Sequence, residues 1–135
     1  MSIINLAEAA INDVPELELL PAGTEVEARL LNILKGEDRN EKRYLSPFFE
    51  AVDHPNVAEF SDFIYDPTEP KLTEKERDQA RRRLRDLGEA FDIDWSGDVD
   101  IDEVRGNTRF VVVRVKPASE GYEASNAVSK YVVGH

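Results

Sequence analysis

One stretch of helical periodicity, residues 74–91, separates two groups of strand-like segments and limits the fold more than any other feature. Thr73 and Glu76 form a capping box at its start, and apolar side chains then recur on one helical face. The face expected to be buried consists of Ala80, Leu84, Leu87 and Phe91. Five other segments have strand composition: residues 24–35, 43–52, 58–65, 108–116 and 122–132.

The resulting order is three strands, one helix and two strands. This order predicts an all-β protein with one helix (β/α), and it is the layout of the OB fold, a five-stranded Greek-key barrel with the helix between strands three and four. Other small barrels and α+β sheets can share the order. With 135 residues, the chain has the size of one domain. Because Pro15 and Pro21 interrupt the opening segment, we expect residues 1–23 to form a short helix or extended arm before a barrel domain at 24–135.

Composition limits the cellular locations in which we expect to find the protein. There is no cysteine, so disulfides and thiolate metal sites are excluded. No apolar run approaches the about 20 residues that a membrane span needs, and the opening residues lack the basic segment of a secretory signal. We therefore expect an intracellular protein with no membrane partner.

The net charge of −11 opposes nucleic-acid binding if it is taken as a single number, because affinity for a polyanion comes mainly from Lys and Arg. Its distribution is uneven. Residues 1–27 carry six acids and no base, and residues 86–105 carry eight acids and one base. Residues 28–85 balance twelve bases against twelve acids, and residues 106–135 hold four bases and two acids. A locally basic face is thus compatible with an acidic chain.

Several short motifs, in order, resemble those of phage-encoded single-stranded-DNA-binding proteins found in replication and recombination cassettes. The motifs are Val14-Pro15-Glu16-Leu17-Glu18, Leu20-Pro21-Ala22-Gly23, the strand around Leu45 to Val52, the helix with Leu84, Leu87 and Ala90, Asp102-Glu103-Val104-Arg105-Gly106 and Asn126-Ala127-Val128. The resemblance implies an OB fold and sequence-tolerant binding of single-stranded DNA. It also implies a location in the cytoplasm of the infected bacterial host, with a homodimer or phage replication and recombination proteins as further partners.

Binding of single strands without sequence preference uses aromatic platforms for bases and a basic groove for phosphates. Alternation on residues 43–52 predicts that Tyr44 and Phe48 face outward, and Phe63 and Tyr65 on the next strand extend this platform. Filling of the core is the competing interpretation for each ring. The basic candidates on the ligand-facing strands and loop are Arg39, Lys42, Arg43, Arg114, Lys116 and Lys130. The arginines from Arg77 to Arg85 are instead expected to form a solvated, salt-bridged helix surface.

The segment Asp92–Glu103 matches the spacing of an EF-hand calcium loop, with Gly97 at the sixth position. Its ligands would be Asp92, Asp94, Ser96, Asp98, Asp100 and Glu103. Gly106 and a β-branched segment follow at once, so we expect no exit helix and interpret the segment as an acidic connector. No cofactor is expected, with calcium at this loop as the alternative.

The sequence contains few combinations of residues that could carry out catalysis. The two histidines, His54 and His135, lie in a turn and at the last position, and there is no glycine-rich phosphate loop. We therefore expect a binding protein and not an enzyme. Two other hypotheses stay open, which are an acidic interaction protein that mimics DNA and inhibits a partner, and a calcium-regulated module.

Overall fold

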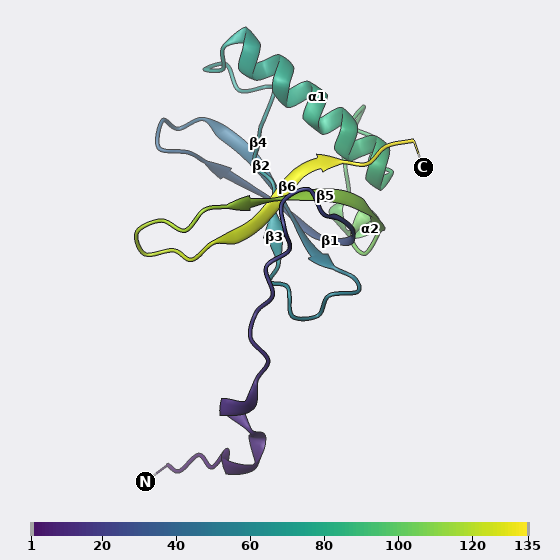
Figure 1. Cartoon of the computed structure of the whole chain (residues 1–135). Helices are drawn as coiled ribbons and strands as arrows, with labels where there is room; N and C mark the ends of the chain where they lie inside the picture. Colours follow the sequence, from purple (N-terminus) through teal and green to yellow (C-terminus); the bar gives the residue numbers. More distant parts are fainter. Residues whose placement is uncertain (1, 135) are drawn as a thin grey trace.

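The computed structural model describes residues 2–134 and shows a small barrel with one long helix packed across it (Figure 1). The strands are β1 (Glu25–Glu37), β2 (Arg43–Ala51), β3 (Phe60–Ser61), β4 (Ile64–Tyr65), β5 (Thr108–Lys116) and β6 (Ser125–Tyr131). The helices are α1 (Glu74–Phe91) and α2 (Ile101–Val104), preceded by two 3₁₀ turns at Ala7–Ala9 and Ile11–Asp13. In this part of the chain, no helix has the length and apolar content needed to cross a membrane.

The sheet closes on itself. β1 pairs antiparallel with both β2 and β5, and β6 pairs antiparallel with β5. β6 also runs parallel to β3, where Ser61 lies opposite Ala127, and β2 pairs with β3 and β4. Since β3 and β4 share one position beside β2, the result is a closed five-stranded mixed barrel with α1 between β4 and β5. This is an OB-fold-like barrel, which confirms the predicted fold class.

The third barrel strand is broken into β3 and β4, although the sequence predicts one continuous strand over 58–65. Pro47 of β2 lies opposite the break, and its carbonyl accepts a hydrogen bond from the Asp62 amide at 3.1 Å. Proline has no N–H to return the second bond of that pair, so the ladder is interrupted there. The Ser46 hydroxyl instead donates to the Asp62 carbonyl at 2.9 Å, which holds the break in place.

Helix α1 begins and ends where its sequence pattern predicts. The Thr73 hydroxyl accepts from the Glu76 amide and the Glu76 carboxylate accepts from the Thr73 amide, so the capping box is present. All four apolar residues predicted for its inner face are buried. The helix ends at Asp92, whose left-handed backbone (φ 59°) lets its amide donate to the Gly88 carbonyl.

Gly88 sits where α1 meets the chain that follows it. A Cβ at this position would lie 2.7 Å from the Ile93 carbonyl oxygen and 2.8 Å from Trp95 Nε1. Trp95 is itself held by a hydrogen bond from Nε1 to the Leu84 carbonyl at 2.8 Å. The backbone at residue 93 and the tethered indole leave no room for a methyl group.

We therefore expect Gly88→Ala to destabilise the protein, even though alanine gains about 1 kcal/mol of helix propensity over glycine. Because the clash is with backbone and a tethered ring, we expect it to cost about 2–3 kcal/mol, the upper part of the range typical of overpacking, and the expected net loss in the free energy of unfolding is then about 1–2 kcal/mol. Urea denaturation would measure it. Gly97→Ala is the matched control, since nothing lies within 4 Å of a Cβ there. A Gly88→Ala variant as stable as that control would contradict the packing described here.

Aromatic rings form the centre of the core. Phe49 of β2 is fully buried, and its ring centroid lies 5.2 Å from Phe91, 5.9 Å from Phe60 and 6.1 Å from Tyr131. These rings come from β2, β3, β6 and the end of α1. The core therefore joins the helix to the inside of the barrel. Burial of these large aromatic surfaces stabilises the contact between them.

A buried polar network joins the same elements. Arg83 Nε donates to Asp62 Oδ2 at 2.7 Å, and the Tyr131 hydroxyl donates to the same oxygen at 2.7 Å. The other two nitrogens of the Arg83 guanidinium donate to the carbonyls of Val128 and Ser129 on β6. Burial raises the pKa of the Tyr131 hydroxyl well above its usual range. The network ties α1 to the break in the third strand and to β6.

The segment that follows α1 contains a short helix that the sequence interpretation missed. α2 forms one turn near the end of the segment predicted to be an acidic loop, because the Asp100 carboxylate accepts from the Asp102 amide and caps it. The turn ends at Arg105, whose amide donates to the Ile101 carbonyl.

The opening segment divides into a projecting part and a docked part. Residues 2–17, which we call the arm, extend away from the barrel (Figure 1). Glu18 then donates its amide to the Asn56 carbonyl, and Leu20 is 2% exposed. The Asn126 side chain accepts from the Leu20 amide and donates to the Leu20 carbonyl, so Asn126 anchors this strand-like segment to β6.

Candidate nucleic-acid interface

Three aromatic side chains gather on the outer surface of β2 and β4. Tyr44 lies opposite Tyr65 in the antiparallel register, and the Phe63 ring centroid is 4.5 Å from Tyr44 and 5.0 Å from Tyr65. Phe63 is 50% exposed, while the two tyrosines are half-buried. We call these three residues the aromatic cluster. It brings together three of the four rings that the sequence predicts for a base-stacking platform.

The position of the cluster follows from the local backbone. Along β2, Pro47 and Phe49 point inward and are buried, so alternation directs Tyr44 and Ser46 outward. Phe63 lies at the break between β3 and β4, and its amide donates to Asp62 Oδ1 at 2.8 Å. The break turns Phe63 out beside Tyr44.

Gly36 on β1 supports the cluster, and the sequence interpretation did not single it out. Gly36 lies opposite Tyr44, and a Cβ there would be 2.7 Å from both Cζ and the hydroxyl oxygen of that tyrosine. The absent side chain therefore lets the Tyr44 ring lie flat across β1. A glycine directly opposite an aromatic residue in a hairpin is the sequence signal that would have identified it.

The hairpin loop between β1 and β2 is tied to the cluster through Tyr65. The Tyr65 hydroxyl donates to Asp38 Oδ2 at 2.7 Å, and the amides of Asn40 and Lys42 donate to Asp38 Oδ1. The bond from Tyr65 holds the pKa of the Asp38 carboxyl below its usual range, and the same bond raises the pKa of Tyr65. Asp38 is thus a charged anchor that orders the loop beside the rings.

The basic residues of this loop have different roles. Lys42 Nζ lies 5.6 Å from the centroid of the Tyr65 ring and pairs with Glu76 at 3.3 Å. Arg43 pairs with the buried Glu69 at 3.2 Å and donates to the Thr68 carbonyl, so it attaches the turn after β4 to β2. Arg39 is exposed at the tip of the loop, and no ion pair to it is present among residues 2–134. Among the residues that the structure describes, Arg39 is therefore the basic residue of this loop that is not held in an ion pair, while Lys42 and Arg43 each pair with a glutamate.

The remaining predicted cations lie on β5 and β6. Arg114 and Lys116 are exposed near the loop that joins these strands, opposite Ala127 and Ser125. This loop and the β1–β2 loop project on the same side of the barrel, at the left in Figure 1. Lys130 lies farther from the loop, opposite Val112. The structure therefore places Arg114 and Lys116 at the loop end of the barrel and Lys130 away from it.

Phe48 stands apart from the cluster. It is partly exposed on β2, opposite Asn32 on one side and Ser61 on the other. Within the described residues its ring makes no stacking contact with the cluster. Its outward direction agrees with the predicted alternation, but it does not share the platform.

A hollow of about 190 Å³ opens between the cluster and α1. Phe63 and Tyr65 line it from the barrel, and Glu76, Gln79 and Arg83 line it from the helix. Gln79 is exposed and offers an amide that can both donate and accept hydrogen bonds. An exposed ring beside polar side chains of this kind can hold a planar group by its face and its edge.

The acidic connector uses its side chains locally. Asp92 pairs with Arg109 at 3.4 Å, Asp94 accepts from the Ser96 amide, and Asp100 caps α2. Asp98 and Glu103 are exposed. Among residues 2–134, no three His, Cys, Asp or Glu side chains form a group that could hold a metal ion.

Comparison with known proteins adds no family to this description. No model of a known protein family matches the chain. A search of curated proteins likewise finds no matching relative. What is known of the site therefore rests on its geometry.

Proposed function

We propose that this protein binds single-stranded DNA and coats it during phage replication or recombination, as a binding protein and not an enzyme. The observation that carries the proposal is the aromatic cluster on the outer surface of β2 and β4. In OB folds this surface and the adjoining hairpin loops meet oligonucleotides. A half-exposed Phe63 between two tyrosines offers a face to successive bases without reading their sequence.

The charge of the protein sets the character of the binding. The net charge of −11 repels a polyanion at long range, so affinity depends on the few cations at the loop end of the barrel. Four of them, Arg39, Lys42, Arg114 and Lys116, lie in or near the two loops that project together. Two to four phosphate contacts predict a slope of log affinity against log salt of about −1.5 to −3 for single strands.

Fluorescence anisotropy of the full chain with a labelled oligothymidylate tests this proposal. Binding is expected at low salt, and raising the salt from 50 to 200 mM should weaken it by about 10- to 60-fold. Arg39→Ala should flatten the slope by about 0.7, whereas Arg82→Ala on the exposed face of α1 should leave it unchanged. No binding at the lowest salt would overturn the proposal and favour an acidic interaction protein.

A further inference from the structure

The arm exposes an unusual amount of apolar surface. Ile3, Ile4 and Leu17 are 79%, 84% and 73% exposed, and Leu6, Ile11 and Val14 are also more than half exposed. Between these side chains lie Glu8, Asp13 and Glu16, and the arm contains no base. An exposed apolar surface of this kind marks an interaction site. The arm is therefore a segment that is both apolar and acidic and has nothing packed on it.

A second apolar surface lies on the body of the protein, between α1 and β2. It consists of two adjoining hollows of about 480 and 400 Å³, which share Leu45 and Trp95. Leu84 and Pro67 line the first, and Ile33, Val99 and Ile101 line the second. We call this combined surface the α1 groove.

Basic side chains border the α1 groove. Arg81 and Arg85 line the first hollow with side chains 63% and 64% exposed, and Lys35 lines the second. Arg81 pairs with the exposed Asp78 at 3.4 Å and Arg85 with the partly buried Asp86 at 3.7 Å, and such surface pairs hold a side chain weakly. Two acids also line the groove, Asp66, which accepts two hydrogen bonds from Thr68, and Asp98 at the far end, so the lining carries three bases and two acids.

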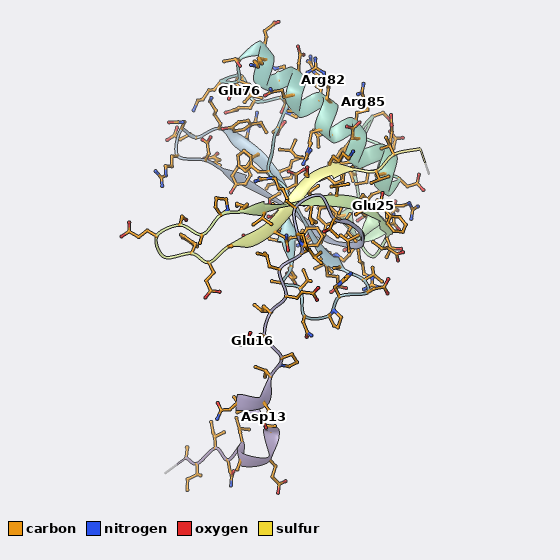
Figure 2. All side chains as sticks on the ribbon, in the orientation of Figure 1. Asp13, Glu16, Glu25, Glu76, Arg82 and Arg85 are labelled. Carbon is orange, nitrogen blue, oxygen red and sulfur yellow. The ribbon has the colours of Figure 1, made fainter. Side chains whose placement is uncertain are left out.

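The arm and the α1 groove are thus complementary in polarity and charge. The arm lies at the opposite end of the molecule from α1, as the positions of Asp13 and Glu16 relative to Arg82 and Arg85 show (Figure 2). Its 16 residues span at most roughly 55 Å when extended, about twice the length of α1. The arm is therefore long enough to lie along the groove of a neighbouring molecule while pointing away from its own.

We propose that the arm of one copy of this protein docks in the α1 groove of a second copy. The apolar side chains of the arm fill the two hollows, and its acids face Arg81 and Arg85. Because the two surfaces differ, the contact is head-to-tail and can repeat along an open chain of copies. If the copies also bind DNA, which rests on the proposed function, such a chain would cover a strand cooperatively.

Sedimentation velocity of the full chain without DNA tests this contact independently of the proposed function. The average mass should rise above that of the monomer as concentration increases. Ile4→Ser/Ile11→Ser in the arm, or Arg81→Glu/Arg85→Glu in the groove, should weaken self-association at least tenfold. The controls are Ala7→Ser/Ala9→Ser, which introduces two serines in the arm without removing a large apolar side chain, and Lys75→Glu/Arg82→Glu, which reverses two charges on α1 outside the groove. Both should associate like the unmodified chain.

Mixing the two defective variants identifies the surfaces. The variant with a changed arm keeps an intact groove, and the variant with a changed groove keeps an intact arm. One molecule of each can therefore pair, and a mixture should form a one-to-one dimer and nothing larger. A chain that stays monomeric at all concentrations would overturn the proposal, as would a mixture that does not associate. Cross-linking of the arm to the groove only within a single monomer would show that the arm folds onto its own body and would equally contradict it.

Discussion

Arg83→Ala is expected to lower the free energy of unfolding by about 3–5 kcal/mol, the typical cost of removing one partner from a buried ion pair. The Asp62 carboxylate is 7% exposed and accepts from Arg83 and Tyr131 through one oxygen. Without the guanidinium, that carboxylate stays buried with its charge uncompensated. The carbonyls of Val128 and Ser129 on β6 lose their donors as well.

Urea unfolding followed by circular dichroism would measure the loss. Arg82→Ala is the matched control, because Arg82 is the exposed neighbour on the same helix and its loss should change stability by no more than about 0.5 kcal/mol. The double variant Asp62→Ala/Arg83→Ala should lose less than the sum of the two single variants, because the partners are in direct contact. A loss below 1 kcal/mol for Arg83→Ala would show that the network does not stabilise the fold.

Phe63→Ala is expected to weaken binding of single-stranded DNA by about 5- to 150-fold, which corresponds to the 1–3 kcal/mol that one base–aromatic stack contributes. Tyr44→Ala should have a similar effect, because its ring lies 4.5 Å from Phe63 and forms the same platform. Half of the Phe63 side chain is already in contact with solvent, so its removal should cost the fold little. Phe63→Trp keeps a flat ring and should retain most of the affinity.

Oligothymidylate titrations by anisotropy would measure these affinities. Phe110→Ala provides the matched control, since Phe110 is 40% exposed but lies on β5, opposite Glu27 of β1. Equal affinities for Phe63→Ala and Phe110→Ala would mean that bases do not stack on the cluster. If both bound as tightly as the unmodified protein, phosphate contacts alone would account for the affinity.

The sequence predicts those parts of the fold that follow from local periodicity. The bounds of α1 agree with the structure because a capping box and an amphipathic pattern define both its start and its buried face. Alternation on β2 likewise predicts that Tyr44 points out and Phe49 points in. Alternation cannot show the break at Pro47, because the break depends on which strand lies beside that proline.

Parts of the structure that depend on long-range contacts cannot be predicted from local sequence patterns. Arg83 lies in a run of arginines that were expected to be solvated, but the barrel brings Asp62 and Tyr131 to it from distant parts of the chain. Arg43, which is predicted as a phosphate ligand, also pairs with Glu69, because the turn after β4 folds back over it. Charged residues are alike in sequence, and only the fold decides which of them are neutralised.

The most direct test of the aromatic cluster is an NMR titration of the full chain, labelled at its phenylalanine and tyrosine rings, with unlabelled oligothymidylate. Stacking predicts that the ring resonances of Phe63 and Tyr44 shift in proportion to the fraction bound, while those of Phe110 and the buried Phe49 stay in place. Shifts confined to other rings, or no shift at saturating oligonucleotide, would contradict the assignment of this surface as the DNA-binding site.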